Sequence, residues 1–105
     1  MAQITTQLEN ILRKYIDELE THNFHVKTAY LFGSHSRGEN SEYSDIDVAL
    51  VSDQFEGNSF LDKEKIRRIT IDVDYHLSPF PYKTEDFTIE DLFVKEILET
   101  GIKIV

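Results

Sequence analysis

Two acidic residues, Asp45 and Asp47, stand one residue apart where a polar stretch gives way to the apolar run 48–51. If this run begins a strand, side chains two residues apart project from the same face, so the two carboxylates lie together. Close carboxylates repel each other, and a bound cation relieves that repulsion. Mg²⁺ prefers one or two carboxylates together with waters and substrate phosphates. The pair therefore predicts a magnesium site that works on a phosphate-bearing substrate.

The segment before this pair carries residues suited to holding phosphate. Gly33 follows the apolar run 29–32 and, lacking a Cβ, lets the backbone approach a ligand closely. Ser34 and neighbouring backbone N–H groups can bond phosphate oxygens. Arg37 adds a planar, positively charged guanidinium group that can donate hydrogen bonds to phosphate. Phosphoryl and nucleotidyl transfer depend mostly on positioning and charge neutralisation, so these few groups could suffice for catalysis.

A third acid is expected from the segment 69–77, whose apolar and polar residues alternate as in a strand. Asp72 and Asp74 share the polar face of this predicted strand. If it pairs with the strand that begins at Asp45, one of these two acids can join Asp45 and Asp47. Three carboxylates can hold two metal ions for in-line attack on a phosphate, and one of them can accept the proton of an attacking hydroxyl.

The surrounding pattern predicts the elements that position these groups. We expect helices over 3–22 and 60–68 and a third from Thr88 that buries Leu92 and Phe93 and ends at Gly101. Strands are expected over 26–32, 45–52, 69–77 and 102–105, with a loop over 33–44; the third strand would end at the prolines 79 and 81. The predicted class is α/β (α+β): a small mixed sheet with helices packed on one side, in a single domain over 1–105.

Composition limits the partners. The chain has 105 residues and a formal net charge of −9, so it repels nucleic acid phosphates, and nucleic acid is not expected as a partner. No apolar run is long enough to cross a membrane, and a secretory signal is not expected from the first ten residues. Cysteine is absent, which agrees with a cytoplasmic location.

The stretch 33–50, GSHSRGENSEYSDIDVAL, resembles the signature of the polymerase-β-type nucleotidyltransferase superfamily. That signature is Gly-Ser, a spacer with Arg-Gly, and Ser-Asp-x-Asp at the opening of a strand. The chain length and leading helix resemble the minimal nucleotidyltransferases, which are little more than a catalytic domain. The resemblance implies a polymerase-β-like nucleotidyltransferase fold.

Carried over residue by residue, the resemblance implies that Gly33, Ser34, Arg37 and Ser44 bind the nucleotide. It implies that Asp45 and Asp47 bind Mg²⁺, with two ions allowed, and that ATP is the substrate. The third acid of the family falls on the following strand; Asp72 is preferred there, with Asp74 as its competitor. Little room is left between the second and third strands for a nucleobase, so the nucleotide site is expected to be completed by another chain.

Proteins that this chain resembles commonly pair with a small helical protein of HEPN type. In some pairs the HEPN protein is a toxin, and the minimal nucleotidyltransferase acts as its antitoxin by transferring AMP to it. The expected function is therefore Mg²⁺-dependent transfer of AMP from ATP to a hydroxyl on such a partner. The alternative is a non-catalytic antitoxin that neutralises its partner by direct contact; a homo-oligomer is left open.

Overall fold

A computed structural model describes residues 5–37 and 45–105 of the chain. Helix α1 spans Thr6–Thr21, close to the predicted 3–22, and Thr5 caps it by accepting a hydrogen bond from the backbone N–H of Leu8 at 3.1 Å. One face of α1 is apolar at helical spacing and buried. The buried residues of this face are Leu8, Leu12, Tyr15 and Leu19.

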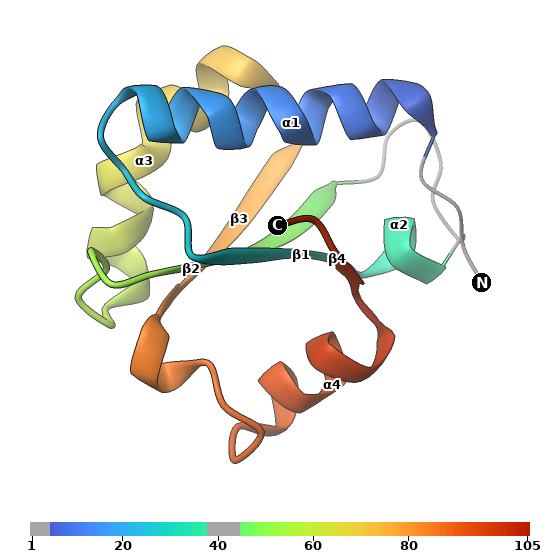
Figure 1. Ribbon diagram of the computed structural model, residues 1–105, viewed down its shortest axis with the longest axis vertical. Coiled ribbons are helices and arrows are strands. Elements are labelled where there is room, and N and C mark those ends of the chain that lie inside the picture. The colour runs from blue at the N-terminus through green and yellow to red at the C-terminus, as the bar shows by residue number, and fades with distance from the viewer. Residues whose placement is uncertain (1–4, 38–44) are drawn as a thin grey trace.

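A four-stranded mixed sheet forms the centre of the molecule, in the order β3-β2-β1-β4 (Figure 1). Strand β1 (Thr28–Phe32) pairs antiparallel with β2 (Ile46–Ser52) and with the two-residue β4 (Ile102–Lys103). Strand β3 (Leu77–Lys83) pairs with β2 in parallel and lies at the edge. The fold class predicted from the sequence, a small mixed sheet with helices, is confirmed.

The helices divide between the two faces of the sheet. Helices α1 and α3 (Ser59–Val73) pack on the face that carries Leu31, Val48 and Leu50. Helix α4 (Leu92–Thr100) packs on the other face, where Ile97 meets Phe32 and Ala49 of the sheet. Figure 1 shows α1 and α4 on opposite sides of the strands. The expectation that the helices lie on one side therefore holds for α1 and α3 but not for α4.

The predicted third strand over 69–77 is wrong, because most of this segment belongs to α3. Asn58 caps that helix by accepting from the backbone N–H of Leu61 at 3.1 Å, and the helix continues to Val73. Its inner residues recur at helical spacing and pack against the core. Ile71, which the strand pattern required on the apolar face, is instead 52% exposed. The inner residues are Ile66, Ile69, Thr70 and Val73.

Strand β3 contains the two prolines that were expected to end a strand. Pro79 and Pro81 stand opposite Val48 and Leu50 in the parallel register with β2. Proline has no N–H to donate, and it is tolerated in a sheet at an edge strand. Because β3 is an edge strand, both prolines fit inside it. The true third strand therefore begins after the acidic segment rather than within it.

Tyr15 links α1 to α3 in the core, where its hydroxyl oxygen lies 2.6 Å from Oγ1 of Thr70. Burial raises the pKa of the Tyr15 hydroxyl above its ordinary value, and the hydrogen bond to Thr70 opposes this only in part. The folded state therefore favours the neutral phenol, whereas an unfolded chain ionises it above about pH 10. The contribution of Tyr15 to stability is complete below that pH and is lost as the pH rises beyond it.

We therefore expect the melting temperature to fall between about pH 10 and about pH 12, and to fall less steeply in Tyr15→Phe than in the unchanged protein. Circular dichroism melts across this range measure both slopes. Tyr75→Phe, at a tyrosine that is 81% exposed, serves as the control and should follow the unchanged protein. Equal slopes in all three proteins would contradict the role given to Tyr15.

Within residues 5–37 and 45–105, no helix has the length and apolar character needed to span a membrane.

Candidate functional site

The predicted phosphate loop begins where β1 ends. Gly33 follows Phe32 with a backbone φ of +75°, a conformation that glycine adopts without the penalty of a Cβ. The short helix α2 (Ser34–Arg37) starts immediately afterwards. Ser34 therefore lies at the turn between a buried strand and this helix. The side chain of Arg37 and the whole of Ser44 lie outside the part of the chain that the structure describes.

Asp47 packs directly on this turn. It stands opposite Phe32 in the antiparallel register of β1 and β2, and its side chain is half-buried. A Cβ added to Gly33 would overlap the Asp47 carboxylate oxygen Oδ2, with the remainder of that side chain also in contact. The absence of a side chain at position 33 thus allows the carboxylate to lie against the backbone. The structure brings together two motifs that the sequence separates by thirteen residues.

Asp45 lies one residue before β2 and is exposed. The next residue, Ile46, donates its backbone N–H to the carbonyl oxygen of His76 at 2.8 Å. This bond places the segment just before β3 beside the start of β2. The segment 74–76 therefore lies beside the start of β2 next to Asp45. Asp47, in contrast, packs on the turn at Gly33 and stands opposite Ser78 of β3.

Asp74 belongs to that flanking segment. It ends α3 in an extended conformation, and its Oδ1 accepts from the backbone N–H of His76 at 2.8 Å and lies 3.0 Å from the His76 Nδ1. Its side chain is 22% exposed. Only Tyr75 lies between Asp74 and His76, whose carbonyl bonds to Ile46, so this acid is held near the end of the sheet where Asp45 lies.

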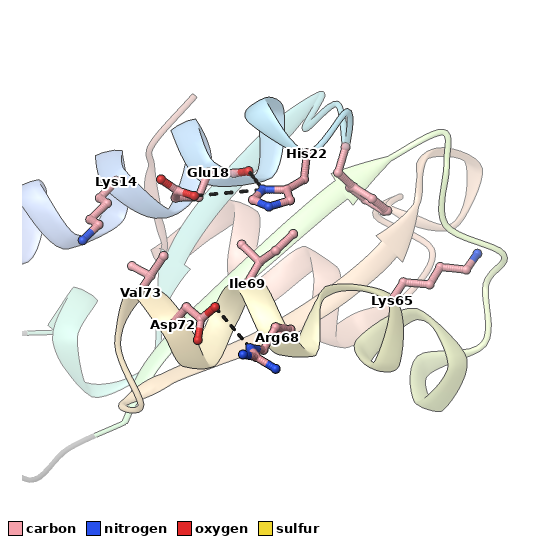
Figure 2. A pocket seen from close by; sticks show the side chains of 9 residues that line it. Lys14, Glu18, His22, Lys65, Arg68, Ile69, Asp72 and Val73 are labelled. Carbon is pink, nitrogen blue, oxygen red and sulfur yellow. Dashed lines mark hydrogen bonds and ion pairs between the residues drawn. The ribbon is translucent and has the colours of Figure 1, made fainter.

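Asp72 lies elsewhere. It is on the outer part of α3, where its carboxylate pairs with Arg68 one turn earlier at 3.3 Å. Figure 2 shows this pair at a cavity between α3 and α1, across from Glu18 and His22. Helix α3 packs on the face of β2 that carries Val48, whereas Asp47 points to the opposite face. The structure therefore does not bring Asp72 beside Asp47, because the strand that would have carried it is a helix.

The donor set suits a hard divalent cation. Asp45 and Asp47 offer carboxylate oxygens at one end of the sheet, and Mg²⁺ is commonly held through one or two carboxylates plus phosphates of the substrate. Among the described residues, no group of three histidine or acidic side chains is gathered closely enough to hold a metal ion without such help. The residues present therefore fit an ion that arrives with a phosphate ligand.

A cavity of about 260 Å³ adjoins the same site, and the sequence did not reveal it. Gly33 and Asp47 form one end, and three phenylalanine rings and one face of α4 form the remainder. Phe93, which was expected to be buried, is 43% exposed here. Reading the segment 77–83 as an edge strand would have placed Phe80 on the Asp47 face, since Ser78 stands opposite Asp47. The three rings belong to Phe32, Phe80 and Phe93.

The class of the protein follows from a comparison with known families. A family model for the nucleotidyltransferase domain matches residues 10–104, which include the α2 turn, Asp45 and Asp47. The chain belongs to this nucleotidyltransferase family. The prediction from the Gly-Ser and Asp-x-Asp motifs is confirmed at this level.

One relative is described as a "Putative protein adenylyltransferase" of Methanocaldococcus jannaschii. It is 46% identical over 45 residues, which make up 43% of this chain and 51% of the relative. The match therefore spans about half of the relative's length.

Two solved structures share the fold. A crystal structure from Sulfolobus solfataricus, described as a "putative nucleotidyltransferase", has a TM-score of 0.68 at 17% identity and covers 92% of this chain and 78% of its own. A crystal structure described as "the toxin-antitoxin with AMP-PNP" has a TM-score of 0.63 at 18% identity and covers 92% and 72%. At these identities the likeness concerns the fold alone.

Proposed function

We propose that this protein transfers AMP from ATP to a hydroxyl group on a partner protein. The observation that carries the proposal is the contact between Gly33 and the Asp47 carboxylate. It joins a backbone turn suited to phosphate with an acid suited to a metal ion, inside a chain of the nucleotidyltransferase family.

Each residue of the site has a distinct proposed role. Gly33 and Ser34 hold the triphosphate through backbone N–H groups and the serine hydroxyl, and Arg37 and Ser44 complete this grip. Asp45 and Asp47 hold Mg²⁺. When bound, Mg²⁺ neutralises phosphate charge and favours in-line displacement at the α-phosphate. The acceptor oxygen then bonds to that phosphorus, and pyrophosphate leaves.

We place the third acid at Asp74 rather than at Asp72. Asp74 is held by His76 near the start of β2, whereas Asp72 pairs with Arg68 on the helix that covers the other face. A carboxylate near Asp45 can accept the proton of the acceptor hydroxyl as the new bond forms. In this proposal Asp74 is the base that takes this proton.

The acceptor is proposed to be a small helical protein of HEPN type, and the reaction is proposed to make this protein an antitoxin. Two comparisons support this direction. The relative from Methanocaldococcus jannaschii is named for protein adenylylation, and one structure of the same fold is of a toxin–antitoxin with an ATP analogue. The net charge of −9 favours a protein acceptor over nucleic acid.

Labelled nucleotides test the reaction. The protein is incubated with Mg²⁺, with each small HEPN-type protein encoded in the same genome, and with ATP labelled at either the α- or the γ-phosphate. Transfer of AMP predicts an acceptor labelled from α-labelled ATP and not from γ-labelled ATP. Labelling from the γ-phosphate would show phosphoryl transfer instead, and an absence of label from both would contradict the proposal.

A second candidate function is neutralisation of the partner by contact alone. It is favoured by Ile89 and Leu92, large apolar side chains that are 65% and 80% exposed near the start of α4. Apolar groups in such positions are often covered by a partner protein. The two candidates differ in whether neutralisation needs ATP and the acids of the site.

A further inference from the structure

The cavity beside Asp47 has the shape and chemistry for a flat ring. Phe32 is buried and fixes the wall, and the rings of Phe80 and Phe93 stand at 5.0 Å and 5.6 Å from it, centroid to centroid. Phe80 and Phe93 are 6.0 Å apart with their planes inclined by only 34°. Phe93 leaves 43% of its surface exposed in this position. An aromatic ring with an exposed face is a stacking platform for a nucleobase.

The size of the cavity indicates how much of a ligand it takes. Its volume of about 260 Å³ is below the roughly 300–1,000 Å³ of pockets that enclose a whole drug-sized molecule. One ring system fits, and the remainder of the ligand must lie outside. Because Gly33 and Asp47 form the adjoining wall, that remainder would extend toward the phosphate turn and the acids.

One face of α4 supplies two polar side chains of the cavity, Glu96 and Thr100, in addition to Asp47 of β2. Phe93, Glu96 and Ile97 follow one another at helical spacing, and all of them line it. Glu96 is exposed at the rim, so its carboxylate can accept a hydrogen bond from a ligand without a cost of burial. A carboxylate accepts from an amino group and repels a carbonyl oxygen. This preference separates adenine, which has an exocyclic amino group at C6, from hypoxanthine, which has a carbonyl there.

We propose that this cavity is the nucleobase site, with the base stacked on Phe93 and Glu96 selecting an amino-bearing base such as adenine. The inference rests on the proposed function, since it assumes that phosphates lie at Gly33. It differs from the expectation that another chain must complete the nucleotide site. The described residues already provide a ring pocket beside the acids.

Binding measurements with two ligands test the stacking. Isothermal titration in the presence of Mg²⁺ compares ATP with inorganic tripolyphosphate, which has the phosphates but no base. Phe93→Ala should weaken ATP binding about tenfold and leave tripolyphosphate binding unchanged, because stacking on one aromatic ring is lost. Phe93→Tyr should retain ATP binding. Leu92→Ala, at an 80% exposed neighbour that does not line the cavity, should match the unchanged protein.

The amino preference is tested with ITP, in which the amino group of ATP is replaced by a carbonyl oxygen. The unchanged protein should bind ATP about tenfold more tightly than ITP, and Glu96→Gln should reduce this ratio to about one, because an amide can also donate. Equal binding of ATP and ITP by the unchanged protein would overturn the role of Glu96.

The remaining outcomes separate this proposal from the proposed function. If Phe93→Ala binds ATP as the unchanged protein does, the base site is overturned and the transferase proposal stands. If Phe93→Ala loses affinity for ATP and for tripolyphosphate by the same factor, Phe93 acts through the fold, and the base site is again overturned. If the unchanged protein binds neither ligand, the transferase proposal and the base site both fail.

Discussion

Replacing Asp45 and Asp47 together by asparagine is expected to lower AMP transfer by at least about a thousandfold while the fold is retained. Asparagine has nearly the same shape as aspartate, but a neutral amide does not attract Mg²⁺ or offset the charge that builds up on the transferred phosphate. The rate of label transfer from α-labelled ATP measures the loss, and a circular dichroism melt checks the fold.

A matched control removes two negative charges at other positions. Asp17 and Asp86 are exposed acids on α1 and on the 3₁₀ turn after β3, away from the site. Asp17→Asn combined with Asp86→Asn should transfer AMP as the unchanged protein does. Retained transfer in the variant at positions 45 and 47 would refute the site. Neutralisation of the partner by that variant, without transfer, would support the contact-only function.

Gly33→Ala is expected to lower transfer by about a hundredfold, because the added methyl group must displace the Asp47 carboxylate, and misplacing a reacting group by about 1 Å costs on that order. A second effect acts on stability. The φ of +75° at position 33 is unfavourable for alanine by about 1–2 kcal/mol, so the free energy of unfolding should fall. Urea unfolding and label transfer measure the two effects separately.

Gly57 provides the control for the backbone effect. It has a φ of +90°, and a Cβ there would come 3.1 Å from the Asp86 Oδ2. Gly57 follows the end of β2, whereas Asp45 and Asp47 lie at its start. Gly57→Ala should therefore lose a similar amount of stability and retain full transfer. If both glycine variants lost transfer equally, the loss would reflect the weaker fold, and the contact between Gly33 and Asp47 would have no special part in catalysis.

The sequence predicted the first half of the fold well, because there the signals are local. Capping and a helical apolar face determine α1, and the continuous apolar runs determine β1 and β2. The pairing of those two strands then brings Gly33 to Asp47. The sequence analysis named both residues but did not predict this contact, because it did not pair these two strands.

The third strand could not be placed from the same kind of signal. Residues 69–77 alternate between apolar and polar, but the inner positions of α3 also recur there at helical spacing, so the two patterns overlap. Tertiary contacts decide between the two patterns. Ile66 and Thr70 of the helix are buried, with Thr70 bonded to Tyr15 of α1. The edge position of the sheet is then taken by the later segment 77–83, whose prolines are tolerated there. Because that element is a helix, Asp72 does not lie beside Asp47, and the third acid proposed above is Asp74.

The two prolines of β3 have a consequence for how this protein can assemble. The carbonyl of His76 bonds to β2, so alternate residues from 76 onward face β2, and Pro79 and Pro81 fall on the outer side. A row of outward positions without N–H groups offers few donors to a further strand. Pairing of a strand from another molecule with the edge of β3 is therefore disfavoured, both in aggregates and in complexes formed by β-augmentation. A protein that docks here must instead recognise side chains.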